Sequence, residues 1–227
     1  MKCIRLQDNF RTSDYDNLEP ILIFDIDNTL YKENKDLIIQ RRLPGYNLLK
    51  QEIKITFDQF NNLSEKYTHE YGLNYVGFIT DYNLKSETIH KLDTIIGNCK
   101  PYFTDINAKV QLFQKLPYKK IAFSNTNMAQ SKKTLEDLGI DKFFDILFAP
   151  TFEIDKKCIC KPSEEAFTVV NNIINRKLNK KILFFDDNIK NVNMANKIGW
   201  NGVHVTDSDK LYSLVNETVE KYLGLKL

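Results

Sequence analysis

The stretch Ile21-Leu22-Ile23-Phe24-Asp25-Ile26-Asp27-Asn28-Thr29 joins four apolar residues to a polar run. A short, unbroken apolar run is typical of a strand buried on both faces of a parallel sheet. Because side chains alternate along a strand, Asp25 and Asp27 are expected to leave its carboxyl end on the same side. Open α/β sheets bind ligands beyond that end. The two carboxylates are therefore candidates for holding a cation, attacking an electrophile or transferring a proton, although Asp and Asn are also common in plain turns.

Beyond residue 107 the sequence alternates between short apolar runs and helical segments. Strands are predicted at 121–123, 146–148, 182–185 and 203–205, and helices at 127–138, at 164–175, up to 198 and at the C-terminus. Strands separated by helices form parallel sheets with right-handed crossovers. Residues 1–20 are expected to be a polar lead-in to the first strand. This part of the chain therefore predicts an α/β domain.

Residues 31–107 follow a different pattern, with apolar residues at helical spacing and no clear strand. The longest run of this spacing comprises Phe57, Phe60, Leu63, Tyr67 and Tyr71. Gly72 is predicted to end that helix, Gly77 to interrupt the next stretch, and Ser86 to cap a helix that reaches residue 96. We therefore expect a helical insertion within the α/β domain.

The composition excludes several classes of protein. With 227 residues, 42% of them hydrophobic and 27% charged, the chain suits one globular domain with a sizeable insertion. A net charge of +2 predicts no basic surface for nucleic acid. No run approaches the roughly 20 apolar residues of a membrane span, and the N-terminus has no apolar signal segment. The sequence predicts no oligomeric state.

The four cysteines and three histidines form no recognisable metal or disulfide framework. The cysteines are Cys3, Cys99, Cys158 and Cys160. Their spacing does not match that of zinc sites or redox motifs, and no histidine lies near the last two. Reduced thiols and a cytoplasmic location are therefore expected.

Polar residues follow the other predicted strands. These groups are Ser124-Asn125 after the strand at 121–123, Lys161 before the helix at 164–175, and Asp186-Asp187 after the strand at 182–185. Each falls at a strand's carboxyl end or at the start of a helix, where backbone amides favour anions. We therefore expect these groups to meet Asp25 and Asp27 at one edge of the sheet.

Four converging carboxylates would strongly repel one another. At an effective dielectric near 20, each pair about 4 Å apart would cost on the order of 4 kcal/mol, which is a large share of the roughly 5–15 kcal/mol that stabilises a domain. Lys161 alone cannot offset this repulsion, whereas a divalent cation can. An all-oxygen ligand set that retains water suits Mg²⁺ better than zinc.

In this order, Asp25-x-Asp27-x-Thr29, Ser124-Asn125, Lys161-Pro162 and Asp186-Asp187 resemble the four motifs of the haloacid dehalogenase superfamily of phosphohydrolases. Further segments are similar to the yeast-type pyrimidine 5′-nucleotidases, namely 24–31, 70–73, 160–162 and 166–167. The resemblance implies a Rossmann-like parallel sheet core flanked by helices, formed by 1–30 and 108–227. It also implies a helical cap, 31–107, inserted after the first strand.

The resemblance implies a Mg²⁺-dependent phosphomonoester hydrolase with an aspartyl-phosphate intermediate. Asp25 would be the nucleophile, Asp27 would protonate the leaving alkoxide and then deprotonate water, and Lys161 would neutralise charge. The implied phosphoryl-binding residues are Thr29, Ser124 and Asn125. The implied Mg²⁺ ligands are Asp25, the backbone carbonyl of Asp27, Asp186 and Asp187, with Asp187 the more direct of the last two.

The substrate is expected to be a small phosphomonoester, selected by the aromatic-rich cap. UMP or CMP is the leading hypothesis, a sugar phosphate is the alternative, and a non-catalytic nucleotide-binding protein on the same fold is a third. A carboxylate at Asp27 disfavours dehalogenase activity, whereas a phosphomutase stays open on these motifs. Most cap aromatics are expected to pack internally, and Tyr71 and Tyr75 are the candidates for contacting substrate. Arg41-Arg42 is expected to be a solvated surface pair, with contact to an anionic substrate as the alternative.

Overall fold

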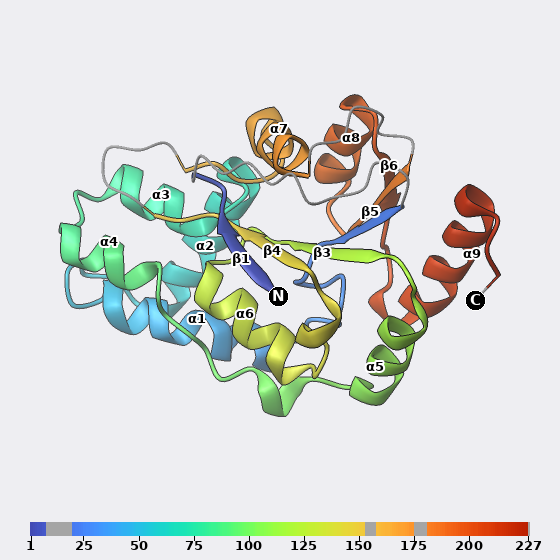
Figure 1. Cartoon of the computed structure of the whole chain (residues 1–227). Helices are drawn as coiled ribbons and strands as arrows, with labels where there is room; N and C mark the ends of the chain where they lie inside the picture. The colour runs from blue at the N-terminus through green and yellow to red at the C-terminus, as the bar shows by residue number, and fades with distance from the viewer. Residues whose placement is uncertain (8–19, 153–157, 175–180, 227) are drawn as a thin grey trace.

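A six-stranded parallel sheet forms the centre of the fold (Figure 1). The computed structural model describes residues 1–7, 20–152, 158–174 and 181–226. Within these residues the strand order is β1-β4-β3-β2-β5-β6, and every neighbouring pair is parallel. The strands are β1 (Lys2–Arg5), β2 (Ile21–Phe24), β3 (Lys119–Phe123), β4 (Ile146–Ala149), β5 (Ile182–Asp186) and β6 (Asn201–His204). The predicted α/β fold with a parallel sheet is therefore confirmed.

Helices cover both faces of this sheet. On one face, Leu22 and Phe24 pack with α5 (Ile106–Lys115), α6 (Met128–Asp137) and α9 (Leu211–Leu223). On the other, Ile21 and Ile23 pack with α7 (Glu164–Ile173) and α8 (Ile189–Lys197). All four residues of β2 are fully buried, because this strand has a helical layer on each side. Short 3₁₀ turns complete the description at Lys100–Tyr102, Asp141–Phe143 and Ser208–Lys210.

The strand order reverses at β2, and this reversal positions the site. From β2 the chain runs outward through β3 to β4, and it then returns through α7 to place β5 on the opposite side of β2. The crossovers that leave β2 and β5 therefore diverge, which opens a crevice at the carboxyl ends of these two strands. The polar runs that follow β2, β3 and β5 all begin at this edge.

The strand β1 was not predicted, because residues 1–20 were expected to be a lead-in. It pairs with β4 at the edge of the sheet, with Cys3 beside Leu147 and Ile4 beside Phe148. Only Ile4 is buried among its four residues, so β1 lacks the apolar run that marks the inner strands. The helical insertion consequently follows the second strand in chain order. The remainder of the predicted lead-in, 8–19, lies outside the described residues.

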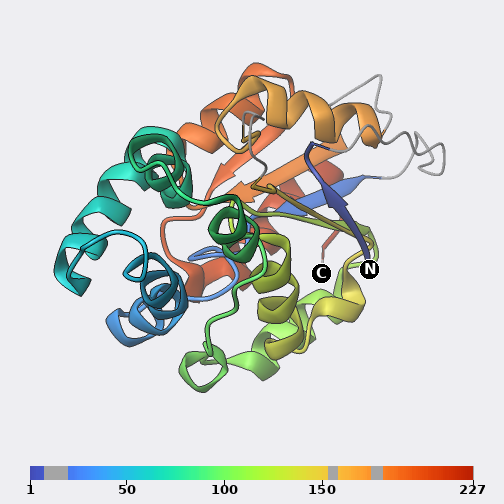
Figure 2. The same ribbon diagram turned by 90° about the vertical axis from the view of Figure 1, so that its left-hand side faces the viewer.

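Of the helices that lie between β2 and β3 in the chain, four pack together at one end of the sheet (Figure 2). They are α1 (Lys35–Leu49), α2 (Phe57–Tyr71), α3 (Asn74–Asp81) and α4 (Ser86–Leu92), and we call them the cap. Phe60, Tyr67 and Phe78 form the centre of an apolar cluster of the cap, which also contacts Phe152. The helical character of this region is as predicted, whereas the exact division at residues 31 and 107 stays a prediction.

Three predicted helix boundaries in the chain differ from the structure. Gly77 does not interrupt a helix but lies inside α3, where an added Cβ would meet the ring of Tyr67 at 2.1 Å. Its missing side chain lets α3 pack closely against α2. Ser86 is the first residue of α4 rather than its cap, and the helix ends at Leu92. The predicted end of α7, Asn175, lies outside the described residues.

Gly72 ends α2 as predicted, with a left-handed φ of +79° that an L side chain rarely adopts.

In the described ranges no helix combines the length and apolar character needed to cross a membrane. The four cysteines are free thiols.

Candidate active site

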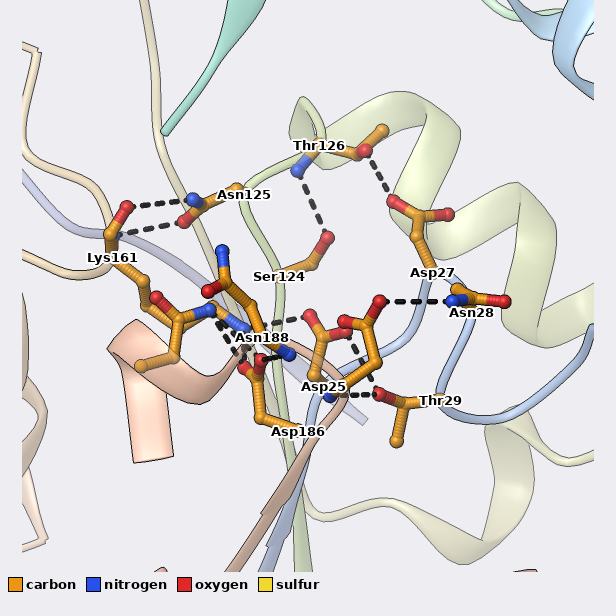
Figure 3. A network of polar contacts seen from close by, with 12 residues as sticks. Asp25, Asp27, Asn28, Thr29, Ser124, Asn125, Thr126, Lys161, Asp186 and Asn188 are labelled. Carbon is orange, nitrogen blue, oxygen red and sulfur yellow. Dashed lines mark hydrogen bonds and ion pairs between the residues drawn. The ribbon is translucent and has the colours of Figure 1, made fainter. Parts of the chain in front are cut away.

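The turn after β2 is fixed against the end of β5 (Figure 3). Asp25 leaves the strand while its backbone amide still bonds to the carbonyl of Phe185, at 2.9 Å. Asn28 has a left-handed backbone, with φ +57°, which Asn tolerates better than most residues. Its side-chain amide donates to Asp187 at 2.9 Å. The strand pairing and the Asn28 contact together hold the acidic turns after β2 and β5 side by side.

Lys161 bridges two of the acids at the bottom of the site. Its Nζ lies 2.7 Å from a carboxylate oxygen of Asp25 and 2.7 Å from one of Asp186, and the residue is fully buried. Burial lowers the pKa of this ammonium, but the two carboxylates outweigh burial and raise the pKa above its ordinary value. Lys161 therefore stays charged, as its predicted role requires.

Burial and neighbouring carboxylates oppose the ionisation of Asp25, and Lys161 offsets them only in part. Burial raises the pKa of this carboxyl well above the ordinary value, and the charges of Asp186 and Asp187 raise it further, whereas Lys161 lowers it. The Thr29 hydroxyl donates to its second oxygen at 3.1 Å. A carboxylate must be ionised to act as a nucleophile, so this position calls for additional positive charge.

Three carboxylates converge in a way that suits a metal ion. One oxygen from each of Asp25, Asp186 and Asp187 lies within 4.8 Å of the others. Asp186 is fully buried and already accepts bonds from Lys161, from the Asn188 amide at 2.8 Å and from Asn191. Asp187 accepts one side-chain bond, from Asn28, and lines the cavity described below. The donor set is all oxygen, so the residues fit Mg²⁺, with Asp187 the more available of the pair.

The carboxylate of Asp27 points away from this cluster, so three acids converge rather than the expected four (Figure 3). It accepts hydrogen bonds from Thr126 and Tyr31 and pairs with Arg41 of α1 at 2.8 Å. Burial raises the pKa of Asp27, but Arg41 and the two hydroxyls outweigh burial and hold the pKa below its ordinary value. The two acids of the opening motif thus have different surroundings.

The residues predicted to bind the phosphoryl group contact the protein itself in this structure. Thr29 accepts the Asp187 amide at 3.0 Å, and Ser124 accepts the Thr126 amide at 2.9 Å. Both are fully buried. The side chain of Asn125 donates to the carbonyls of Gly72 at 2.9 Å and Lys161 at 2.8 Å, and it accepts the Lys161 amide at 2.9 Å. Their binding of phosphate stays a prediction.

We call the three bonds made by the Asn125 side chain the Asn125 latch, because they join the cap to the loop that carries Lys161. Gly72 is required at this contact for a second reason besides its backbone angle. An added Cβ would lie 2.3 Å from the Lys161 carbonyl oxygen. The latch therefore fixes the backbone of Lys161 through both its carbonyl and its amide.

Replacing Asn125 by Ala is expected to lower activity about 10- to 100-fold, because a small displacement of a catalytic group is costly. Loss of buried hydrogen bonds should also destabilise the protein by about 1–3 kcal/mol. Steady-state kinetics and thermal unfolding measure these effects, with Asn62→Ala on the exposed face of α2 as the control. Full activity of Asn125→Ala would contradict a positioning role for the latch.

A cavity of about 280 Å³ opens between the cap and the sheet edge, and we call it the central cavity. The described residues that line it from the sheet side include Asp25, Asp27, Lys161, Asp187 and Asn188. Those that line it from the cap include Arg41, Arg42, Thr68, Asn74 and Tyr75. Three motif acids, Asp25, Asp27 and Asp187, and the motif lysine therefore share one cavity with a polar cap surface.

The placement of cap residues differs from two expectations. Arg41-Arg42 is not a solvated pair, since the two side chains are only 21% and 18% exposed and both line the central cavity. Arg41 lies on the same face of α1 as buried Leu37 and Gly45, a four-residue spacing that could have indicated its burial. Tyr71 is 37% exposed and does not line the central cavity, whereas Tyr75 does. Tyr71 instead borders a separate apolar depression beside Phe152 and Pro162.

Comparison of the sequence with known proteins identifies the family of this chain. Residues 20–199 match the family model of the haloacid dehalogenase-like hydrolases. The chain is 28% identical to Phosphate metabolism protein 8 of Saccharomyces cerevisiae over 217 residues, which cover 89% of this chain and 66% of that protein. The chain thus spans slightly less than two thirds of the yeast relative.

Solved structures share the fold at low sequence identity. A haloacid dehalogenase-like family hydrolase from Xanthomonas campestris aligns with a TM-score of 0.51 and 10% identity, covering 95% of this chain and 97% of that one. The HAD-hydrolase YfnB of Bacillus subtilis, solved bound to magnesium, aligns with a TM-score of 0.50 and 17% identity, covering 87% and 99%. The family match spans all four motifs, each of which contributes a side chain to the central cavity, and the predicted resemblance is confirmed: this chain belongs to the haloacid dehalogenase-like hydrolases.

Proposed function

We propose that this protein is a Mg²⁺-dependent phosphomonoester hydrolase whose substrate is a pyrimidine nucleoside 5′-monophosphate such as UMP or CMP. The observation that carries the proposal is the pair of acids in one cavity with unlike surroundings. Asp25 is paired with Lys161, while the Asp27 carboxylate contacts the cap. One acid is suited to attack phosphorus and the other to move a proton.

The proposed reaction has two steps. A carboxylate oxygen of Asp25 attacks the phosphorus, the bond from phosphorus to the ester oxygen breaks, and the leaving alkoxide takes a proton from Asp27. Water then attacks the aspartyl-phosphate and gives a proton to Asp27, which releases phosphate and restores Asp25. A substrate dianion near Asp27 raises the pKa of this carboxyl, which supports its protonation in the complex.

The metal would be held by Asp25, Asp187, Asp186 and the backbone carbonyl of Asp27. When bound, Mg²⁺ supplies positive charge that neutralises these carboxylates and the phosphoryl oxygens. Three carboxylates cluster around one lysine, and this excess of negative charge supports the requirement. The magnesium bound to the Bacillus subtilis relative is consistent with it.

The leaving group separates a phosphohydrolase from a dehalogenase. A halide leaves without a proton, whereas an alkoxide needs one, and the carboxylate of Asp27 lines the central cavity where it can supply it. The likeness of several segments to pyrimidine 5′-nucleotidases supports a nucleotide. A cavity of about 280 Å³ also favours small ligands, so a sugar phosphate is the second candidate. Intact Asp25, Asp27 and Lys161 argue against a binding protein without turnover.

A panel of phosphomonoesters assayed for released phosphate tests the proposal. Hydrolysis of UMP and CMP in preference to purine nucleotides and sugar phosphates is the expected result. Preference for sugar phosphates would reject the nucleotidase but keep the phosphatase. Inactivity towards the whole panel in the presence of Mg²⁺ would reject both.

Removal of metal by EDTA is expected to abolish activity, and added Mg²⁺ should restore it. Because the ion offsets repulsion among the three clustered carboxylates, Mg²⁺ should also raise the melting temperature. Asp187→Asn is expected to raise the Mg²⁺ concentration needed for both effects by at least about 10-fold. Asp58→Asn, on the exposed face of α2, is the charge-matched control. A melting temperature that does not change when Mg²⁺ is added would contradict a metal site here.

A further inference from the structure

Arg42 is a partly buried cation in the central cavity that the proposed reaction does not use. Its side chain is 18% exposed, and the carboxylate that it pairs with, Glu65, is 3.6 Å away and 71% exposed. Its other described partner is the side-chain oxygen of Asn61 at 3.4 Å. Burial and the charge of Arg41 both lower the pKa of Arg42. A guanidinium in this position lacks a close, buried counter-charge among the described residues.

Arg41, although adjacent in sequence, is fully engaged. It pairs with Asp27 at 2.8 Å and with Glu33, and it donates to the Tyr31 hydroxyl at 3.1 Å. Its role is therefore to hold the acid, which leaves Arg42 as the available cation on the cap side of the cavity.

Tyr75 supplies a second donor to the same side of the cavity. The residue is 9% exposed, and among the described residues its hydroxyl has no hydrogen-bond partner. The ring is held edge-on against Phe152, with centroids 5.6 Å apart. Gly45 of α1 makes room for the hydroxyl, because a Cβ at that position would lie 2.1 Å from the Tyr75 oxygen. The hydroxyl oxygen is open to the central cavity rather than enclosed, so it is free to donate to a ligand bound there.

We propose that Arg42 and Tyr75 form a leaving-group subsite that binds an acceptor oxygen on the alcohol part of the substrate. The chemistry that fits is a carbonyl oxygen of a nucleobase or a carboxylate, since a guanidinium has only donors and the phenol can donate. Lys161 and the three clustered acids serve the phosphoryl end from the sheet side, whereas Arg42 and Tyr75 belong to the cap helices α1 and α3. The subsite deepens the proposed function and rests on it.

The subsite predicts that the enzyme discriminates against substrates whose alcohol part has no oxygen that can accept a hydrogen bond. A site that hydrogen-bonds a substrate oxygen rejects analogues lacking it, because its buried donors are then left unpaired. Phenyl phosphate has an aromatic leaving group without such an oxygen, UMP carries base carbonyls, and 3-phosphoglycerate carries a carboxylate. Comparing the three compounds therefore distinguishes binding of a base carbonyl, binding of a carboxylate, and apolar contact alone.

The test compares Arg42→Leu and Tyr75→Phe with the native enzyme on these three substrates at saturating Mg²⁺. We expect kcat/KM to fall about 10- to 100-fold for UMP, mainly through KM, and to change less than about threefold for phenyl phosphate. A loss confined to 3-phosphoglycerate supports the subsite with a carboxylate as its ligand. Tyr82→Phe, a half-exposed cap tyrosine outside the cavity, is the matched control.

Two results would overturn the subsite: unchanged kinetics in both variants, or an equal loss on all three substrates. Tyr75→Phe keeps the ring and its packing, so it should fold even where Arg42→Leu does not. Inactivity of the native enzyme on all three compounds would contradict the proposed function instead. Calorimetry would then measure the binding of UMP and 3-phosphoglycerate to Asp25→Asn, with and without the additional change Tyr75→Phe. Weaker binding in the double variant supports the subsite, whereas unchanged binding, or no binding to either variant, rejects it.

Discussion

Lys161→Met is expected to abolish turnover and to destabilise the protein by about 3–5 kcal/mol. The substitution keeps most of the length of the buried side chain but leaves Asp25 and Asp186 facing each other without the ammonium that lies 2.7 Å from each. The two carboxylates would then repel in a buried site, or would take up protons and lose their function. Chemical denaturation measures the stability, and phosphate release from UMP measures the activity.

Lys120 offers a matched control for this effect. It is also a buried lysine, but its ammonium donates to the carbonyls of Leu116 and Tyr118, each at 2.7 Å, and it forms no ion pair within the described residues. Lys120→Met removes a positive charge but leaves no buried carboxylate without its counter-charge. We therefore expect a smaller loss of stability and an unchanged kcat. Equal destabilisation by the two variants would show that the Lys161 bridge has no special electrostatic importance.

Asp25→Asn is expected to reduce kcat by at least about 10³-fold, because an amide cannot form the acyl-phosphate. Its effect on stability should be the opposite of that of Lys161→Met. The folded-state pKa of Asp25 lies well above the unfolded value, so its ionisation lowers stability as the pH rises through the interval between the two values. The metal-free Asn variant lacks this cost and should be at least as stable as the native protein at neutral pH.

Thermal unfolding from pH 4 to pH 8 without metal measures the second effect. The native protein should lose stability relative to Asp25→Asn as the pH rises. Native-like turnover by Asp25→Asn would reject the covalent mechanism. A large drop in its stability would instead show that the carboxylate is needed for the fold.

The sheet and the acidic turns could be predicted because their signals are local. A strand buried on both faces must be apolar at each position, as Ile21–Phe24 is, and the residues after such strands meet wherever parallel strands end. The edge strand β1 buries only Ile4, so this signal is absent there. Helical spacing in the cap likewise predicts the helices but not which face of each helix lies towards the site, which is why Arg42 was expected to be solvated.

The direction of Asp27 also depends on tertiary structure. Alternation of side chains holds along a strand, but β2 ends at Phe24, and the chain turns through the left-handed Asn28 soon afterwards. Asp27 therefore contacts Arg41 and Thr126, neither of which its neighbours in sequence indicate. The role of Asn125 in joining cap and sheet edge was similarly invisible, because its partners are backbone atoms far along the chain.

The Asn125 latch has a consequence for how such hydrolases can diverge. Among the residues that the structure describes, it bonds to the cap through the carbonyl of Gly72, an atom that every residue type possesses. Cap side chains can therefore mutate to accommodate new substrates without breaking the contact, provided that the glycine and the asparagine are kept. We expect homologues with different specificities to vary at Arg42 and Tyr75 far more than at Gly72 and Asn125, so that the joint between the two parts evolves slowly while the pocket evolves fast.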